Sequence, residues 1–255
     1  WSIKMDKKVI DNIVWYIPFR KLRDAVREYL SNISNYADSN KDFKILHLIT
    51  KEATQESVRY ICENGSNARM FVDRFQLLKF MLEEHVKTND YKDKLFLEFG
   101  VFEGSTINFC SSLMPEIEFY GFDSFEGLPE TSGIWAKGNF DVKEKLPKVN
   151  KNVSLIKGYF NETLPKFLEE HKEKAAFIHI DCDLYSSTKT IFDNIYDRIV
   201  PNTVIQFDEY YNYPGWRNHE FKAFQEFCKK YSVEYEYIGI SSAYQVAVVI
   251  KSIKN

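Results

Sequence analysis

From residue 94 onward, short apolar runs rich in β-branched and aromatic residues alternate with stretches of helical periodicity. The runs are almost continuously hydrophobic, which is typical of strands buried on both faces of a parallel sheet. The predicted strands are LFLEF (95–99), IEFYGF (117–122), VSLI (153–156), AFIHI (176–180), TVIQF (203–207) and YQVAVVI (244–250). The helices expected between them cover 105–113, 162–171, 186–199 and 219–230. This alternation predicts an α/β fold, with a mostly parallel sheet and helices on both of its faces.

The N-terminal region is helical in pattern. Between Val9 and Leu30, apolar residues recur at near-helical spacing, interrupted by Pro18 and flanked by lysines and arginines. Two short amphipathic helices explain this pattern. We interpret them as a pair that docks on the catalytic domain or forms oligomers. The alternative is contact with a membrane surface through the basic stripe.

Residues 31–45 are polar and rich in Asn, Ser and Asp, which predicts a linker. A second helical region is expected over 54–86, where apolar residues repeat at intervals of three and four. The predicted domains are therefore a helical segment with its linker, 1–45, and an α/β domain, 46–255.

The overall charge excludes some classes of partner. With 34 basic against 37 acidic side chains, the net charge of −3 offers no large electropositive field, so no nucleic-acid polymer is expected as a partner. No stretch approaches the roughly 18 consecutive apolar residues of a membrane-spanning helix. The four cysteines are widely spaced, and we expect reduced, mostly buried thiols in a cytoplasmic protein.

The first predicted strand runs into the turn GVFEGST. A strand, a glycine turn and a helix start bring backbone close to a nucleoside at the carboxyl edge of a parallel sheet. Gly100 permits the tight turn, Gly104 permits a close approach, and Ser105 or Thr106 is expected to cap the helix. In the dinucleotide motif G-x-G-x-x-G, the second and third glycines would fall on Phe102 and Ser105. The turn is therefore poorly suited to bind the pyrophosphate of a dinucleotide.

An acidic residue closes the second predicted strand. Asp123 lies twenty-three residues after Gly100, close to the position at which this architecture hydrogen-bonds a ribose diol. The glycine turn and the carboxylate together predict a nucleoside site. The alternative is that Asp123 and Ser124 only begin the turn that leads to Gly127.

Two further predicted strands also end in carboxylates. Asp181 and Asp183 follow one strand, and Asp208 and Glu209 follow the next, at the edge where such sheets place their sites. Four acids gathered there repel one another unless a cation or protons compensate. We expect a hard divalent metal bound by Asp181, Asp208 and Glu209, with waters and substrate oxygens completing an octahedron. The alternative is a set of solvated turn acids, with Asp183 as the cap of the next helix.

Three other residues have side chains that can take part in catalysis. His179 lies within a predicted strand and His219 in a loop that leads into a helix, so core packing or a surface position is the alternative to catalysis for each. Cys182 lies between two acids, which raise the pKa of its thiol and suppress the thiolate. We therefore expect Cys182 to be inert.

Five segments carry a joint pattern: EFGVFEGST, FDSFEGLPE, KGYFNETLP, HIDCDLYSST and FDEYYNYPGWRNHEFKAF. In this order they resemble the macrocin and mycinamicin sugar O-methyltransferase family, which belongs to the class I methyltransferases. The similarity covers roughly residues 70–250. It implies a Rossmann-like fold with a seven-stranded sheet and an antiparallel last hairpin, which fits YEYIGI followed by YQVAVVI.

The resemblance implies S-adenosylmethionine as cofactor and assigns its site by position. The residues expected to bind it are Glu98, Gly100, Gly104 and Ser105 on the methionine and adenosine side, Asp123 and Ser124 at the ribose, Gly158, Tyr159 and Phe160 near the adenine, and Asp181. Relatives hold Mg²⁺ through an Asp at the fourth strand and an acidic pair after the fifth. Here these are Asp181, Asp208 and Glu209, where Glu209 replaces the second Asp of some relatives.

The implied reaction is methyl transfer from S-adenosylmethionine to a sugar hydroxyl. Asp181 is the first candidate to accept the hydroxyl proton, with His179 and His219 as alternates, and the resulting alkoxide attacks the methyl group in line. The loop 126–141, with Trp135, is expected to close over the acceptor.

The N-terminal IVWYIPFRKLR differs from that family and resembles a segment found beside bacterial surface-glycan enzymes. It favours a capsule or lipopolysaccharide sugar as acceptor, such as a nucleotide-activated heptose. A homo-oligomer is also expected. Two alternative functions stay open. One is an NAD-dependent oxidoreductase, which Phe102 in place of a glycine disfavours. The other is a non-catalytic nucleoside-binding module, which the clustered acids disfavour.

Overall fold

The computed structural model describes residues 7–15, 20–39, 44–133, 135–143 and 145–254. The chain divides into two compact units, 1–52 and 53–255, which are described separately. The helices are α1 (Lys7–Trp15), α2 (Arg20–Ser39), α3 (Lys44–Asn64), α4 (Arg74–Phe80), the π-helix η1 (Met81–Val86), α5 (Ser105–Leu113), α6 (Phe160–Glu170), α7 (Tyr185–Ile195), α8 (Glu220–Tyr231) and the 3₁₀ turns η2 (Tyr196–Arg198) and η3 (Trp216–Asn218). The strands are β1 (Arg69–Phe71), β2 (Leu95–Phe99), β3 (Phe119–Asp123), β4 (Val153–Lys157), β5 (Ala175–Ile180), β6 (Val204–Phe207), β7 (Glu234–Ser241) and β8 (Val246–Ser252).

The first unit contains the two predicted amphipathic helices, α1 and α2; Pro18, where a break was predicted, lies outside the described residues. Val14 of α1 is buried. Arg27 of α2 donates a hydrogen bond to Asp11 of α1 at 2.8 Å, with Asp24 also 2.9 Å from its guanidinium. An ion pair therefore joins the two helices.

The linker predicted over 31–45 is wrong wherever the structure describes it. Residues 31–39 belong to α2, and residues 44–45 belong to α3. The sequence reason is that Leu30, Ile33 and Ala37 follow one another at intervals of three and four. This helical periodicity outweighs the weak helix propensity of the Asn and Ser residues between them.

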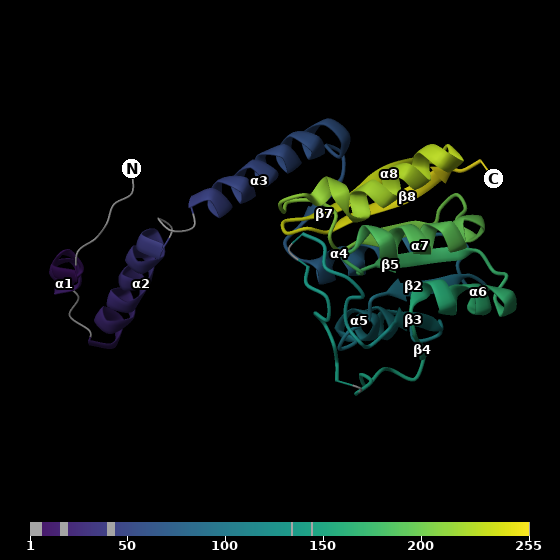
Figure 1. Cartoon of the computed structure of the whole chain (residues 1–255), viewed down its shortest axis with the longest axis horizontal. Helices are drawn as coiled ribbons and strands as arrows, with labels where there is room; N and C mark the ends of the chain where they lie inside the picture. The colour runs from purple at the N-terminus through teal and green to yellow at the C-terminus, as the bar shows by residue number, and fades with distance from the viewer. Residues whose placement is uncertain (1–6, 16–19, 40–43, 134, 144, 255) are drawn as a thin grey trace. The chain divides into compact units, whose positions relative to one another are not determined.

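The second unit is built on a sheet that, among the described residues, has eight strands in the order β1-β7-β8-β6-β5-β2-β3-β4 (Figure 1). β8 runs antiparallel to both β6 and β7, and the remaining pairs are parallel. The antiparallel last hairpin is thereby confirmed. The strand count of seven is wrong. The additional strand is β1, which pairs with β7 and lies in the region 54–86, where only helix was predicted.

Helices cover both faces of the sheet, as predicted (Figure 1). One buried cluster joins Leu97 and Phe99 of β2 to apolar residues of α6, α7 and α8. The other joins Phe96, on the opposite face of β2, to residues of α4, η1 and α5. Since successive strand side chains point to opposite faces, the continuous run LFLEF serves both clusters.

Candidate active site

A cavity of about 310 Å³ lies at the carboxyl edge of the sheet, where β2 to β6 end. Its volume is within the range of small-molecule sites, roughly 300–1,000 Å³. The predicted site residues that line it are Gly100, Ser105, Asp123, Ser124, Gly158, Tyr159, Phe160, Asp181 and Glu209. Those that do not line it are Glu98, Gly104, His179, Asp208 and His219.

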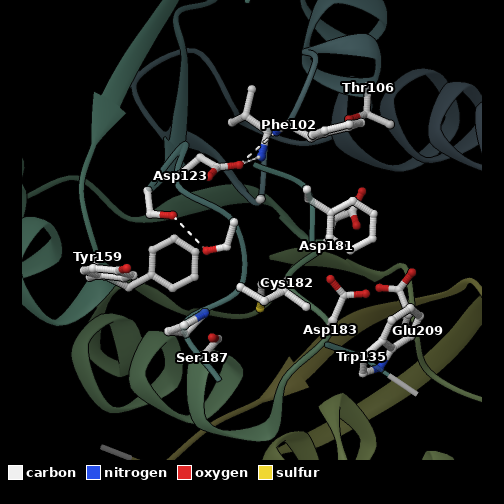
Figure 2. A pocket seen from close by; sticks show the side chains of 18 of the residues that line it. Phe102, Thr106, Asp123, Trp135, Tyr159, Asp181, Cys182, Asp183, Ser187 and Glu209 are labelled. Carbon is white, nitrogen blue, oxygen red and sulfur yellow. Dashed lines mark hydrogen bonds between the residues drawn. The ribbon is translucent and has the colours of Figure 1, made fainter. Parts of the chain in front are cut away.

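The two ends of the cavity differ in character. Figure 2 shows Asp123 and Tyr159 at one end, and Asp183, Glu209 and Trp135 gathered at the other. The first end carries the glycine turn and the carboxylate expected at a nucleoside. The second end is acidic and aromatic.

The glycine turn packs directly against the strand that carries Asp181. Gly100 has φ +92°, and a Cβ at this position would lie 1.7 Å from the carbonyl oxygen of Asp181. Only glycine combines this backbone conformation with so close an approach. Gly104, with φ +78°, faces Pro147 and Val149 and not the cavity.

The predicted cap of α5 is wrong. Gly104 itself occupies the N-cap position, and the described residues give the helix no side-chain cap. Ser105 faces the cavity. The Thr106 hydroxyl instead donates to Oε1 of Glu98 at 2.9 Å. Thr106 is thus bound to a buried carboxylate and is not free to cap the helix.

Asp123 is held rigidly at the end of β3. Its Oδ2 accepts hydrogen bonds from the backbone N–H groups of Val101 and Phe102, both at 2.8 Å (Figure 2). Its Oδ1 accepts one from the backbone N–H of Phe125 at 2.7 Å. A carboxylate has about four acceptor positions, so this arrangement leaves capacity for a ligand hydroxyl. The carboxylate therefore ties the glycine turn to β3 and still faces the cavity.

Glu98 and His179 form a buried pair behind the cavity wall. Nδ1 of His179 lies 3.0 Å from Oε2 of Glu98, and Nε2 lies 3.5 Å from Oδ1 of Asp208. Burial disfavours the charged ring, but the two carboxylates outweigh it and raise the pKa of His179 to about 10. A cationic ring that does not reach the cavity is badly placed to take a proton from a substrate, so the geometry argues against His179 as the base.

The acids brought together after β5 and β6 include a candidate metal cluster. Single ligand atoms of His179, Asp181 and Asp208 all lie within 4.8 Å of one another. Glu209 is not a member of this cluster, although the sequence predicted it as a ligand. Its side chain is buried and lines the acidic end of the cavity, and burial raises its pKa well above the ordinary value.

Sequence reasoning missed two residues that serve this acidic end. Arg74, from the start of α4, places Nη1 3.0 Å from Oδ2 of Asp208 and 3.6 Å from Oδ2 of Asp181. Glu220, fully buried, accepts hydrogen bonds from the backbone N–H of Cys182 at 3.4 Å and of Glu209 at 3.1 Å. Neither residue lies near the acids in sequence, and only the fold brings them there.

Asp183 faces the cavity and does not cap the next helix. Leu184 is the N-cap of α7, and the described residues give it no side-chain cap. Asp183 adopts φ +61°, a conformation uncommon for residues other than glycine. Burial, followed by the charge of Asp208, raises its pKa to about 7. A carboxylate that titrates near neutrality in a cavity is a candidate general base.

The structure argues against His219 as a base and against Cys182 as a nucleophile, although Cys182 lines the cavity. His219 does not line the cavity; its ring packs beneath Gly133, and burial lowers its pKa. Burial also raises the pKa of the Cys182 thiol well above its ordinary value, and the sulfur lies 3.4 Å from the Thr188 hydroxyl. An inert Cys182 agrees with this. All four cysteines are free, and three of them are buried.

Residues 97–210 match the family model described as a methyltransferase domain. This stretch runs from β2, which carries the glycine turn, to the acids after β6. This part of the chain is similar to a methyltransferase domain. The predicted enzyme class is thereby confirmed, and the rival prediction of an NAD-dependent oxidoreductase loses its support. A search of curated protein sequences gave no match.

Solved structures with a similar fold include CalS11, a calicheamicin methyltransferase. It is 16% identical, with a TM-score of 0.56, over 95% of this chain and 90% of that chain. The O-methyltransferase NovP is 21% identical, with a TM-score of 0.52, over 70% of this chain and 79% of that chain. The predicted Rossmann-like α/β fold is confirmed. Within the described residues, no helix is both long and apolar enough to cross a membrane.

Trp135 brings the loop 126–141 to the acidic end of the cavity, beside Asp183 and Glu209 (Figure 2). The carboxylate of Glu130 accepts a hydrogen bond from the hydroxyl of Ser186 on α7 at 2.6 Å, which ties the loop down. Trp135 lines the cavity, and its buried Nε1 has no hydrogen-bond partner among the described residues. A buried N–H without a hydrogen bond is destabilising, so this N–H is suited to donate a hydrogen bond to a bound ligand.

Proposed function

We propose that this chain transfers a methyl group from S-adenosylmethionine to a hydroxyl of a sugar or nucleotide sugar, assisted by a divalent metal such as Mg²⁺. The observation that carries the proposal is one cavity in the methyltransferase domain that has a nucleoside-type end and an acidic end. NovP, described as an O-methyltransferase, supports the choice of an oxygen acceptor. The five segments that resemble sugar O-methyltransferases support a sugar as the methyl acceptor.

The nucleoside-type end suits the cofactor. Asp123 and Ser124 lie where a ribose would be bound, and Tyr159 offers a partly exposed ring for the adenine. Ser105 and the glycine turn would adjoin the methionine side. Glu98 would act from behind, because its two oxygens are engaged by Thr106 and His179.

The acidic end suits a divalent cation. Two cationic side chains, Arg74 and His179, accompany its carboxylates, which are Asp181, Asp183, Asp208, Glu209 and Glu220. In the part of the chain that the structure describes, Oε2 of Glu209 is buried without a hydrogen bond, and the buried Oδ1 of Asp208 has only the ion-pair contact with Nε2 of His179 at 3.5 Å. The carboxylates outnumber the cationic side chains, and an oxygen of Glu209 lacks a hydrogen bond. Both features favour a hard metal ion. Asp181 and Asp208 would hold it, with Glu209 beside them. When bound, it would supply positive charge that lowers the pKa of the acceptor hydroxyl.

Asp183 is better placed than Asp181 to accept the hydroxyl proton. Asp181 already faces Arg74 and belongs to the candidate metal cluster. Asp183 lines the cavity and is not a member of that cluster. The proton passes from the hydroxyl to the Asp183 carboxylate. The oxygen then attacks the methyl carbon, the carbon–sulfur bond breaks towards sulfur, and S-adenosylhomocysteine leaves. His179 holds Glu98 and Asp208 in place and does not exchange the proton.

The acceptor proposal extends to the biology. The N-terminal segment favours a sugar of a bacterial capsule or lipopolysaccharide as the methyl acceptor. A nucleotide-activated heptose is one such sugar. We propose that the reaction takes place in the cytoplasm, where nucleotide sugars and S-adenosylmethionine are made. A homo-oligomer stays a prediction.

The test is to incubate the full chain with S-adenosylmethionine, Mg²⁺ and a panel of nucleotide sugars, and to analyse the products by mass spectrometry. A methylated sugar formed together with S-adenosylhomocysteine is expected. Thorough chelation with EDTA should abolish the product, and added Mg²⁺ should restore it. Full activity after chelation would remove the metal from the proposal and leave the methyl transfer intact.

A further inference from the structure

Arg74 brings a permanent positive charge to the acidic end from outside the matched segment 97–210. It is the first residue of α4, and the helix start is fixed by Asp73, whose carboxylate accepts hydrogen bonds from the N–H groups of Phe75 at 2.9 Å and Gln76 at 3.0 Å. The Arg74 side chain is 34% exposed and lines the cavity. Its position is therefore set by local structure that the methyltransferase domain does not include.

The guanidinium contacts the same two carboxylates that a metal would use. Nη1 of Arg74 lies 3.0 Å from Asp208 Oδ2 and 3.6 Å from Asp181 Oδ2. With His179, these two residues make up the cluster whose ligand atoms lie within 4.8 Å of one another. An arginine stays charged at all accessible pH values, so a divalent ion on these carboxylates would repel it strongly.

The contact is built in a way that allows the guanidinium to leave. A single nitrogen of Arg74 makes both contacts, whereas tight arginine–carboxylate pairs use two. If the guanidinium moves away, Asp208 Oδ2 keeps its hydrogen bond from Gln245 at 3.1 Å. The guanidinium already lies 5.5 Å from the ring of Phe75, which offers it a second resting place.

We propose that Arg74 is the resident cation of the acidic end and competes with the divalent metal for Asp181 and Asp208. Metal binding displaces the guanidinium, and Arg74 thereby sets the metal affinity of this chain. The proposal rests on the metal part of the proposed function.

The test is a Mn²⁺ titration of the full chain without cofactor, with free Mn²⁺ measured by electron paramagnetic resonance. Arg74→Gln should bind Mn²⁺ at least about tenfold more tightly than the wild type, and Arg74→Lys should fall between them. Asp208→Asn should lose binding in either background. The matched control is Arg69→Gln: Arg69 lies on β1, pairs with Glu84 at 3.2 Å and does not line the cavity, so its affinity should equal that of the wild type.

Thermal unfolding of the same proteins guards against a folding defect. Without metal, Arg74→Gln should unfold at a lower temperature than the wild type, and saturating Mn²⁺ should stabilise it more than the wild type. Equal or weaker Mn²⁺ binding by Arg74→Gln would overturn the competition, as would the absence of Mn²⁺ binding in every form. Methyl transfer is assayed separately: its absence beside normal Mn²⁺ competition would count against the proposed reaction and not against the role of Arg74.

Discussion

The α-carbon of Gly100 faces the carbonyl oxygen of Asp181 so closely that a Cβ would lie 1.7 Å from it. The turn after β2 and the start of the acidic end after β5 are thus in direct backbone contact. This contact makes the cofactor end and the acidic end two parts of one site.

Gly100→Ala should therefore destabilise the second unit severely. The methyl group collides with backbone, and φ +92° is strained for alanine, so we expect a loss of more than about 3 kcal/mol in the free energy of unfolding. Urea unfolding measures it. Gly138→Ala is the matched control, because its φ of +83° carries the same strain but its Cβ would meet nothing within 4 Å. Equal losses in the two variants would show that the contact with Asp181 is unimportant.

The buried His179 should make stability depend on pH. Its folded pKa of about 10 exceeds the ordinary value of 6.5, so its contribution is fully present below about pH 6.5 and is lost as the pH rises through 10. The free energy of unfolding of the wild type should fall over this window, and that of His179→Gln should fall less. Glu98→Gln, which removes one partner carboxylate, should also reduce the slope. Parallel curves for the wild type and His179→Gln would contradict a buried imidazolium.

Asp183 should control the acid side of the pH–rate profile. Its pKa is raised to about 7, so the carboxylate that accepts the proton is lost as the pH falls, and the rate of the wild type should fall with it. Asp183→Asn should lower kcat/KM by about 10²–10⁴ and remove this acid limb. Asp193→Asn serves as control, because Asp193 is on the surface of α7 and pairs with Lys189. An acid limb unchanged in Asp183→Asn would assign the proton to another group.

Trp135 should affect the acceptor and not the cofactor. It lies with Asp183 and Glu209, away from Asp123 and Tyr159 (Figure 2). Trp135→Ala should raise the KM for the sugar about tenfold through lost contact area, with an unchanged Kd for S-adenosylmethionine by calorimetry. Trp15→Ala, at an exposed position on α1, should change neither value. A weaker cofactor Kd in Trp135→Ala would place the acceptor elsewhere.

The repeating part of the fold follows from the sequence. The helix predicted over 105–113 has those bounds in the structure, and the predicted strands all form, because each is a short, mostly apolar run with flanking turns. β1 was missed because three residues, RMF, are too short to show periodicity. Its strand character comes from pairing with β7, which lies far along the chain.

The site was predictable only where it depends on strand ends. Strand-end reasoning predicts that Asp123, Asp181 and Glu209 lie at one edge of the sheet, and all three line the cavity there, because carboxyl ends of parallel strands meet at one edge. Arg74 and Glu220 were missed because their roles depend on contacts across more than one element. The orientation of a strand residue was equally hidden: His179 was weighed as a base, and it lies behind the cavity between two carboxylates.

Transfer of an isotopically labelled methyl group tests the central claim most directly. The full chain is incubated with S-adenosylmethionine labelled with ¹³C in its methyl group, with Mg²⁺ and with a nucleotide sugar that gives product by mass spectrometry. The carbon spectrum should show one new methoxy signal, coupled to a sugar ring proton, that forms about 10²–10⁴ times more slowly with Asp183→Asn. Label that stays on S-adenosylmethionine for every sugar tested, or that reaches nitrogen or carbon and not a hydroxyl oxygen, would contradict a sugar O-methyltransferase.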